Sequence, residues 1–61
     1  MRYYIIFGKN NGVPVCYKTR AATIKDAKNH FYLEAGDTIT EAYKVSKKSW
    51  EIRADAYPLQ H

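Results

Sequence analysis

Cysteine, histidine, glycine and proline are all scarce in this 61-residue chain. The shortage of cysteine and histidine limits the ways in which so small a fold can be stabilised. The single cysteine, Cys16, has no second cysteine with which to form an intramolecular disulfide. One cysteine and two histidines, His30 and His61, also fall short of the ligand cluster that a structural zinc site requires. We therefore expect no disulfide, no metal and no cofactor, and a stability that depends on aromatic packing or on association.

The chain also lacks the groupings from which catalytic sites are assembled. His30 falls toward the polar side of a predicted helix, and His61 is the last residue. Neither Ser46 nor Ser49 has a base placed beside it in the sequence. The glycine-containing segment at residues 8–12 is too short for a phosphate-binding P-loop and lacks the lysine and hydroxyl residue that end one. We expect no catalytic residues and a protein that is not an enzyme.

Long hydrophobic runs are absent as well. The apolar run at residues 3–7 stops at Gly8 and Lys9, so we expect no secretory signal. No segment approaches the roughly 18 apolar residues of a membrane span, and we expect a cytoplasmic protein that does not contact a membrane. Ten lysines and arginines against six acidic residues give a net charge of +4, which favours either a nucleic acid or an acidic protein as partner.

A helix with both ends marked in the sequence is predicted at residues 24–35. Ala27 and Phe31 recur at the spacing of one helical face. Thr23 is placed to cap the first turn, and Gly36 supplies the left-handed residue at which helices commonly end. The block fixes the architecture, because a chain of this size has room for one such helix and a small sheet.

Strand-like segments, rich in the residues that fit a pleated surface, occupy three ranges: residues 2–8, 13–19 and 38–46. Asn11 and Gly12 join the first two, and this pair suits the tight turn of a hairpin. Pro14 has no amide hydrogen, so the second strand should lie at an edge of the sheet there. In the third strand either a regular alternation or a bulge that turns Ala42 inward fits the pattern.

Residues 47–54 fit two structures. One is a turn that leads into a fourth strand at residues 50–54, and the other is a single helical turn capped by Ser46. We favour the helical turn, because a serine before Lys-Lys-Ser-Trp-Glu suits a capped start. Residues 55–61 then form a C-terminal tail. The whole chain, residues 1–61, is predicted to be one α+β domain: a three-stranded, or four-stranded, mostly antiparallel sheet with one helix packed on one face, in the order ββαβ.

The first strand is apolar in both directions. Its alternate side chains form two rows: Tyr3, Ile5 and Phe7 on one face, and Tyr4 and Ile6 on the other. One helix covers one face of a sheet, so a strand of this kind needs a second cover. The sequence allows three candidates for the second cover: the C-terminal stretch that carries Trp50, a second copy of the chain, or a different macromolecule.

This surplus of apolar surface predicts a docking site for a protein partner, built from aromatic anchors with a charged rim. The candidate contacts are Tyr4, Ile6, Trp50 and Tyr57, flanked by Lys44, Lys47 and Lys48. One alternative is a small module that binds DNA or RNA with the same basic surface, stacking bases on tyrosines. Another is a structural homo-oligomer, such as a homodimer.

A pattern of capping and core residues gives the chain a likeness to other small proteins. It is carried by residues 23–28, Phe31, Ile39, Ala42, and residues 44–47 and 50–51. In these positions the chain resembles short uncharacterised α/β proteins of phages and related mobile elements. The resemblance implies a compact protein that grips one host macromolecule and blocks it, as an inhibitor or regulator, anti-defence inhibitors included. It assigns no role to individual residues.

Overall fold

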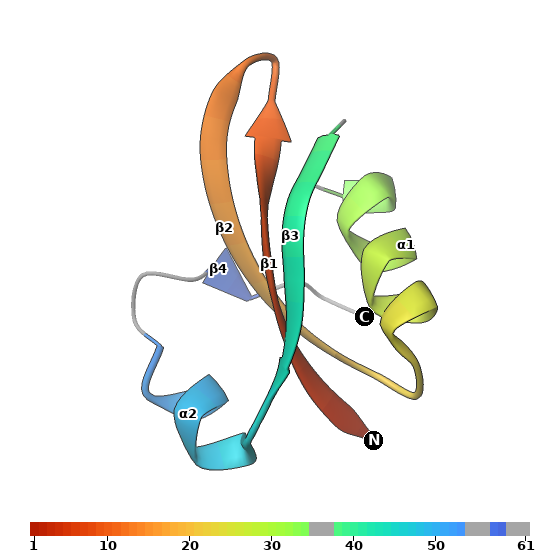
Figure 1. Cartoon of the computed structure of the whole chain (residues 1–61), viewed down its shortest axis with the longest axis vertical. Coiled ribbons are helices and arrows are strands. Elements are labelled where there is room, and N and C mark those ends of the chain that lie inside the picture. The colour runs from red at the N-terminus through yellow and green to blue at the C-terminus, as the bar shows by residue number, and fades with distance from the viewer. Residues whose placement is uncertain (35–37, 54–56, 59–61) are drawn as a thin grey trace.

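The computed structural model describes residues 1–34, 38–53 and 57–58, and its framework is a four-stranded sheet with strand order β3-β1-β2-β4 (Figure 1). The elements along the chain are β1 (Arg2–Asn10), β2 (Val13–Ala21), α1 (Ile24–Glu34), β3 (Thr38–Val45), α2 (Lys47–Glu51) and β4 (Tyr57–Pro58). β1 pairs antiparallel with both β2 and β3, and the short β4 pairs parallel with β2. The predicted α+β fold with the order ββαβ is confirmed.

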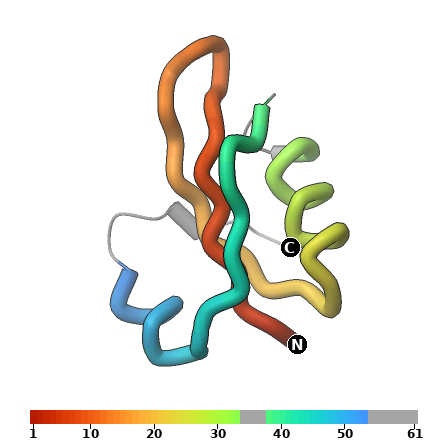
Figure 2. Tube along the Cα trace, viewed as in Figure 1, coloured from red at the N-terminus to blue at the C-terminus, as the bar shows by residue number. Residues whose placement is uncertain are grey.

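The β1–β2 hairpin turns where the Asn-Gly pair predicts. Asn11 and Gly12 have φ values of 53° and 80°, the left-handed conformation that a two-residue hairpin turn requires, and Asn10 pairs with Val13 on either side. Figure 2 shows this loop extending beyond the adjacent end of α1. Pro14 is exposed on a part of β2 whose outer side meets no described strand, where a missing N–H leaves no hydrogen bond unmade.

The helix α1 begins at the predicted cap. Thr23 Oγ1 accepts a hydrogen bond of 3.2 Å from the backbone N–H of Asp26 and so satisfies one of the amides that open the helix. Ala27 and Phe31 are buried against the sheet, whereas Leu33 on the opposite side is 76% exposed. Gly36, the predicted end of the helix, lies outside the described residues.

A bulge separates two parts of the β1–β3 ladder. The register shifts between Phe7 and Gly8, where β3 carries Thr40 as an extra residue. Thr40 Oγ1 donates a hydrogen bond of 3.0 Å to the carbonyl of Phe7 at this point. Because of the extra residue, Ile39 and Ala42 both pack against the core, so the bulged alternative is the one that forms.

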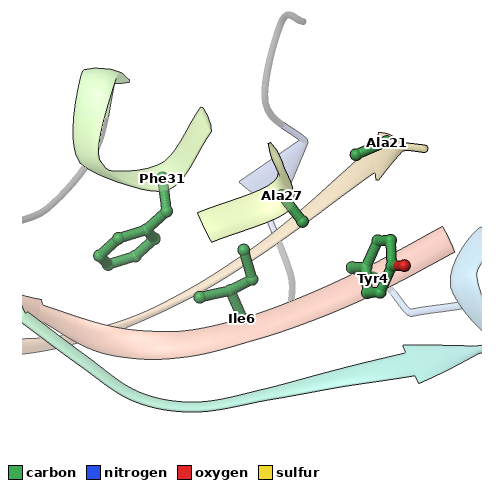
Figure 3. Packing of buried hydrophobic residues seen from close by; sticks show 5 residues of the cluster. All are labelled: Tyr4, Ile6, Ala21, Ala27 and Phe31. Atoms are coloured by element: carbon green, nitrogen blue, oxygen red, sulfur yellow. The ribbon is translucent and has the colours of Figure 1, made fainter. Parts of the chain in front are cut away.

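The main core lies between α1 and the sheet. Its buried residues are Tyr4 and Ile6 from β1, Ala21 from β2, and Ala27 and Phe31 from α1 (Figure 3). Tyr4 is 3% exposed and Ile6 is fully buried. The prediction that these two side chains contact a partner is therefore wrong, because α1 covers the row of β1 to which they belong.

The short helix α2 begins at Ser46, as the preferred interpretation predicts. Ser46 Oγ accepts a hydrogen bond of 3.1 Å from the backbone N–H of Ser49, which caps the first turn. The stretch at residues 47–54 therefore begins as a helix, and the fourth strand is β4, farther along the chain. β4 lies within the predicted tail, of which residues 55, 56 and 59–61 are outside the described residues.

Phe31 lies against Gly8 of β1, where any side chain larger than hydrogen would not fit. A Cβ atom on Gly8 would lie 2.6 Å from Cζ of Phe31 and closer still to the backbone oxygen of Thr38. The glycine thus lets the aromatic ring of α1 approach β1 and β3 directly.

Gly8→Ala should lower the free energy of unfolding by about 1–3 kcal/mol, because the added methyl overpacks the core. Urea denaturation followed by circular dichroism measures the change. Phe31→Leu, which shortens the opposing side chain, should cost less in the Gly8→Ala background than in the wild type. An unchanged midpoint for Gly8→Ala would contradict the close packing.

Candidate functional site

The face of the sheet opposite α1, called the α2 face below, carries the second apolar row of β1. Ile5 is buried at the centre of this row, and Tyr3 and Phe7 on either side of it are half-buried. Directly opposite residues of an antiparallel pair point to the same face, so Lys18 of β2 and Tyr43 of β3, both partners of Ile5, also belong to the α2 face.

Trp50 attaches α2 to this face. Its ring centroid lies 5.3 Å from that of Tyr3, in a tilted arrangement. Lys18 Nζ lies 4.6 Å from the centroid of the Trp50 ring and donates a hydrogen bond of 3.0 Å to the backbone oxygen of Trp50. The same ammonium group therefore holds both the side chain and the backbone of α2, and Trp50 anchors the second cover of β1.

A second aromatic and cationic group lies beside this anchor and is more open to solvent. The rings of Phe7 and Tyr43 meet edge to face with centroids 5.8 Å apart, and the guanidinium carbon of Arg53 lies 5.2 Å from the centroid of Phe7. Tyr43 is 44% exposed, and Ile52, which precedes Arg53, is 73% exposed. We call Phe7, Tyr43, Ile52 and Arg53 the Tyr43 surface.

The phenol of Tyr43 is oriented by its own strand. Its hydroxyl donates a hydrogen bond to the carboxylate Oε2 of Glu41, two residues earlier on the same face. This bond, together with the negative charge of Glu41, raises the pKa of the Tyr43 phenol, and nearby Arg53 acts in the opposite direction. The hydroxyl is thereby held toward Glu41, and Tyr43 remains exposed.

The structure distributes the predicted lysines over two faces. Lys47 and Lys48 belong to α2, where Lys47 Nζ lies 3.9 Å from the carboxylate of Glu51 and Lys48 is exposed. Lys44 pairs with Tyr4, so its side chain belongs to the face that α1 covers. The predicted basic group is therefore split, with only the two lysines of α2 close to Trp50.

Tyr57 is placed by its backbone alone. It lies in β4, opposite Tyr17, at the edge of the sheet farthest from β3. Its side chain falls outside what the structure describes, so its predicted role as a contact stays a prediction.

Sequence reasoning missed the members of the Tyr43 surface as a group. Tyr43 stands in the alternating row of β3, and Phe7 stands in the row of β1 that faces away from α1. The signal was therefore present in the period-two pattern. It did not indicate which row of β1 the long helix would cover, and that choice decides which aromatic residues remain accessible.

A shallow hollow of about 340 Å³ lies at the start of α1, away from the Tyr43 surface. It is lined by Met1, Ala21, Ala22, Asp26, Asn29 and His30. At this point Thr19 Oγ1 lies 2.9 Å from Nδ1 of His30 and joins β2 to α1. The lining holds no side-chain hydroxyl or thiol, and within the described ranges no three histidine, cysteine or acidic residues are grouped to hold a metal ion.

Neither helix, over the residues that the structure describes, is long and apolar enough to cross a membrane. No family model, curated protein or solved structure matches the chain.

Lys18→Met should lower the free energy of unfolding by about 1–2 kcal/mol, because it removes a charged hydrogen bond and a cation–π contact and retains the aliphatic stem. The matched control is Lys48→Met, at an exposed position of α2, where the change should stay within about 0.5 kcal/mol. Chemical denaturation monitored by Trp50 fluorescence measures both. Equal losses in the two variants would contradict the anchoring role of Lys18.

The Tyr43 phenol should titrate at higher pH than an ordinary tyrosine, and Glu41→Gln should lower its pKa. The pKa of the phenol is raised in the folded state. The contribution of the protonated phenol to the stability of the fold is therefore present below the ordinary phenol pKa, and it is lost as the pH rises through the folded-state pKa. NMR titration of the tyrosine ring carbons measures the pKa of Tyr43. The control is Glu51→Gln, which changes the net charge by the same amount at a site away from Tyr43. A Tyr43 titration that Glu41→Gln leaves unchanged would count against the hydrogen bond.

Proposed function

We propose that this protein is a non-catalytic binding protein that docks a protein partner on the Tyr43 surface. One observation carries the proposal: Tyr43 and Ile52 stay exposed beside the contact between Phe7 and Arg53. The large hydrophobic side chains at the two extremes of exposure give the context. Four are buried: Tyr4, Ile5, Ile6 and Phe31. Seven are exposed: Met1, Val13, Ile24, Tyr32, Leu33, Tyr43 and Ile52. Five of the seven lie outside the Tyr43 surface, and an isolated exposed residue is ordinary. Tyr43 and Ile52 belong to that surface, and exposed apolar residues that are grouped indicate an interaction site.

The Tyr43 surface is the group whose composition best fits an interface centre. Aromatic rings and arginine are enriched at such centres, and here Arg53 packs over Phe7 beside the exposed ring of Tyr43. The ring positions are already fixed by contacts within the fold, so binding would order few further side chains. Ile52 adds an aliphatic side chain at the margin, and Lys47 and Lys48 of α2 provide a charged rim.

A protein partner is favoured over a nucleic acid by the way the basic and aromatic residues are used. Base stacking needs an accessible ring close to phosphate-binding cations. Trp50 packs on Tyr3, and Lys18 is bonded to the backbone of α2, so both are engaged within the fold. Lys44 lies on the other face of the sheet from Trp50.

We further propose that the protein acts by occupation, as an inhibitor or regulator of the partner that it covers. The described residues of the Tyr43 surface offer aromatic, aliphatic and guanidinium groups, which suit binding rather than bond-breaking. A domain of this size presents one small surface, and covering a functional surface of the partner is the simplest use of it.

The test is capture from a nuclease-treated lysate of the native cell, with tagged protein and mass spectrometry. The wild type should retain a defined protein, and Tyr43→Ser with Ile52→Ser should reduce its recovery by about tenfold, because the two changes remove apolar contact area from the centre and the margin of the surface. The control is Leu33→Ser, which removes an exposed apolar side chain of α1 outside the Tyr43 surface and should retain the partner. Equal retention by the double variant, or a partner lost on nuclease treatment, would contradict the proposal.

A further inference from the structure

The outer side of β3 is an open edge of the sheet. β3 comes first in the strand order, and no described strand pairs with its outer side along Thr38–Val45. Every residue of β3 has an amide hydrogen, since the strand contains no proline. In an antiparallel ladder alternate residues direct both N–H and C=O to the partner strand, so the others direct theirs outward.

We infer that this edge receives one extended, acidic segment of the partner as an additional β-strand, an inference that rests on the proposed function and specifies how the partner binds. An exposed row of backbone donors and acceptors is a template for strand addition. The bulge at Thr40 interrupts the regular ladder, so the added strand pairs with the part of β3 beyond it, residues 41–45.

The charges along this edge determine the chemistry of the segment. Glu41 is bonded to the hydroxyl of Tyr43, and Lys47 is paired with Glu51. Lys44 and Lys48 are exposed and have no acidic partner among the described residues. Glu41 keeps its negative charge in this bond because the phenol is neutral, so Lys44 and Lys48 together exceed it by one positive charge. Acidic side chains on the added strand would complement this excess.

The alternation of the added strand follows from the two faces of β3. Residues opposite each other in a pair share a face, so the position opposite Tyr43 would lie on the α2 face and extend the apolar contact between Ile5 and Tyr43. The position opposite Lys44 belongs to the other face and would carry a carboxylate. The segment is thus an amphipathic strand in which apolar and acidic residues alternate.

A second copy of the chain fits this edge poorly. Each copy carries the same net charge of +4 and the same two lysines, Lys44 and Lys48, for which the described part of the chain provides no acidic partner. In a two-fold pairing centred on Tyr43, the two Lys44 side chains would be diagonal neighbours on one face, and like charges so placed repel.

The test uses a peptide of about ten residues that alternates valine and glutamate, long enough to span the open edge. Its analogues carry lysine in place of glutamate, or proline in place of two valines. Amide hydrogen exchange of the labelled protein should slow about tenfold at alternate positions of residues 41–45 with the acidic peptide, because these amides acquire partners. The proline analogue should have no effect, since it cannot complete the ladder.

Lys44→Glu should weaken binding of the acidic peptide about tenfold and create binding of the lysine analogue, because the charge opposite the carboxylate is reversed. The matched control is Lys25→Glu, which changes the net charge equally at an exposed position of α1 and should leave both affinities within about twofold. Circular dichroism of each variant checks that the fold is retained.

Three results would overturn strand addition: no slowing of β3 amides by the acidic peptide, equal binding of the lysine analogue to the wild type, or protection of the same amides in a homodimer or by oligothymidylate. The first two leave the proposed function standing if recovery of the partner still depends on Tyr43 and Ile52. Loss of the partner on nuclease treatment removes the proposed function itself.

Discussion

The fold depends on a central strand that is apolar in both directions. β1 lies between β2 and β3, and its two rows of side chains need cover on both faces of the sheet. On one face α1 supplies Phe31, whose ring approaches the backbone closely because Gly8 has no side chain. On the other face α2 supplies Trp50, held against Tyr3. A chain without a second cysteine thus obtains its stability from two small covers on one strand.

The two covers differ in extent, and the candidate site follows from that difference. α1 has 11 residues and seals its row of β1, whereas α2 has five and leaves the far part of the other row half-covered. Phe7 and Tyr43 meet in the uncovered part, beside Arg53 and close to the open edge of β3. An aromatic surface therefore adjoins a row of backbone groups with which no described strand pairs, and both are means of binding an extended protein segment.

Features that depend on neighbouring residues in the sequence could be predicted. Features that depend on contacts between residues far apart in the sequence could not. Thr23 and Ser46 cap the predicted helices, and Asn11 turns the predicted hairpin, because each acts on its immediate neighbours. The alternation in β1 indicated two apolar rows but not which of them α1 would cover. That depends on how Phe31 docks onto the sheet, a contact across many residues, and so Tyr4 was assigned to the surface although it is buried.

The central claim is that one row of β1 is sealed and the surface beside the other row is open. Methyl NMR of the isoleucines with a soluble gadolinium reagent tests it most directly, since the reagent broadens accessible methyl signals. The methyls of Ile5 and Ile6 should be protected, and those of Ile52 should be broadened strongly. Protection of Ile52 equal to that of Ile5 would mean that the α2 face is closed and would contradict the account.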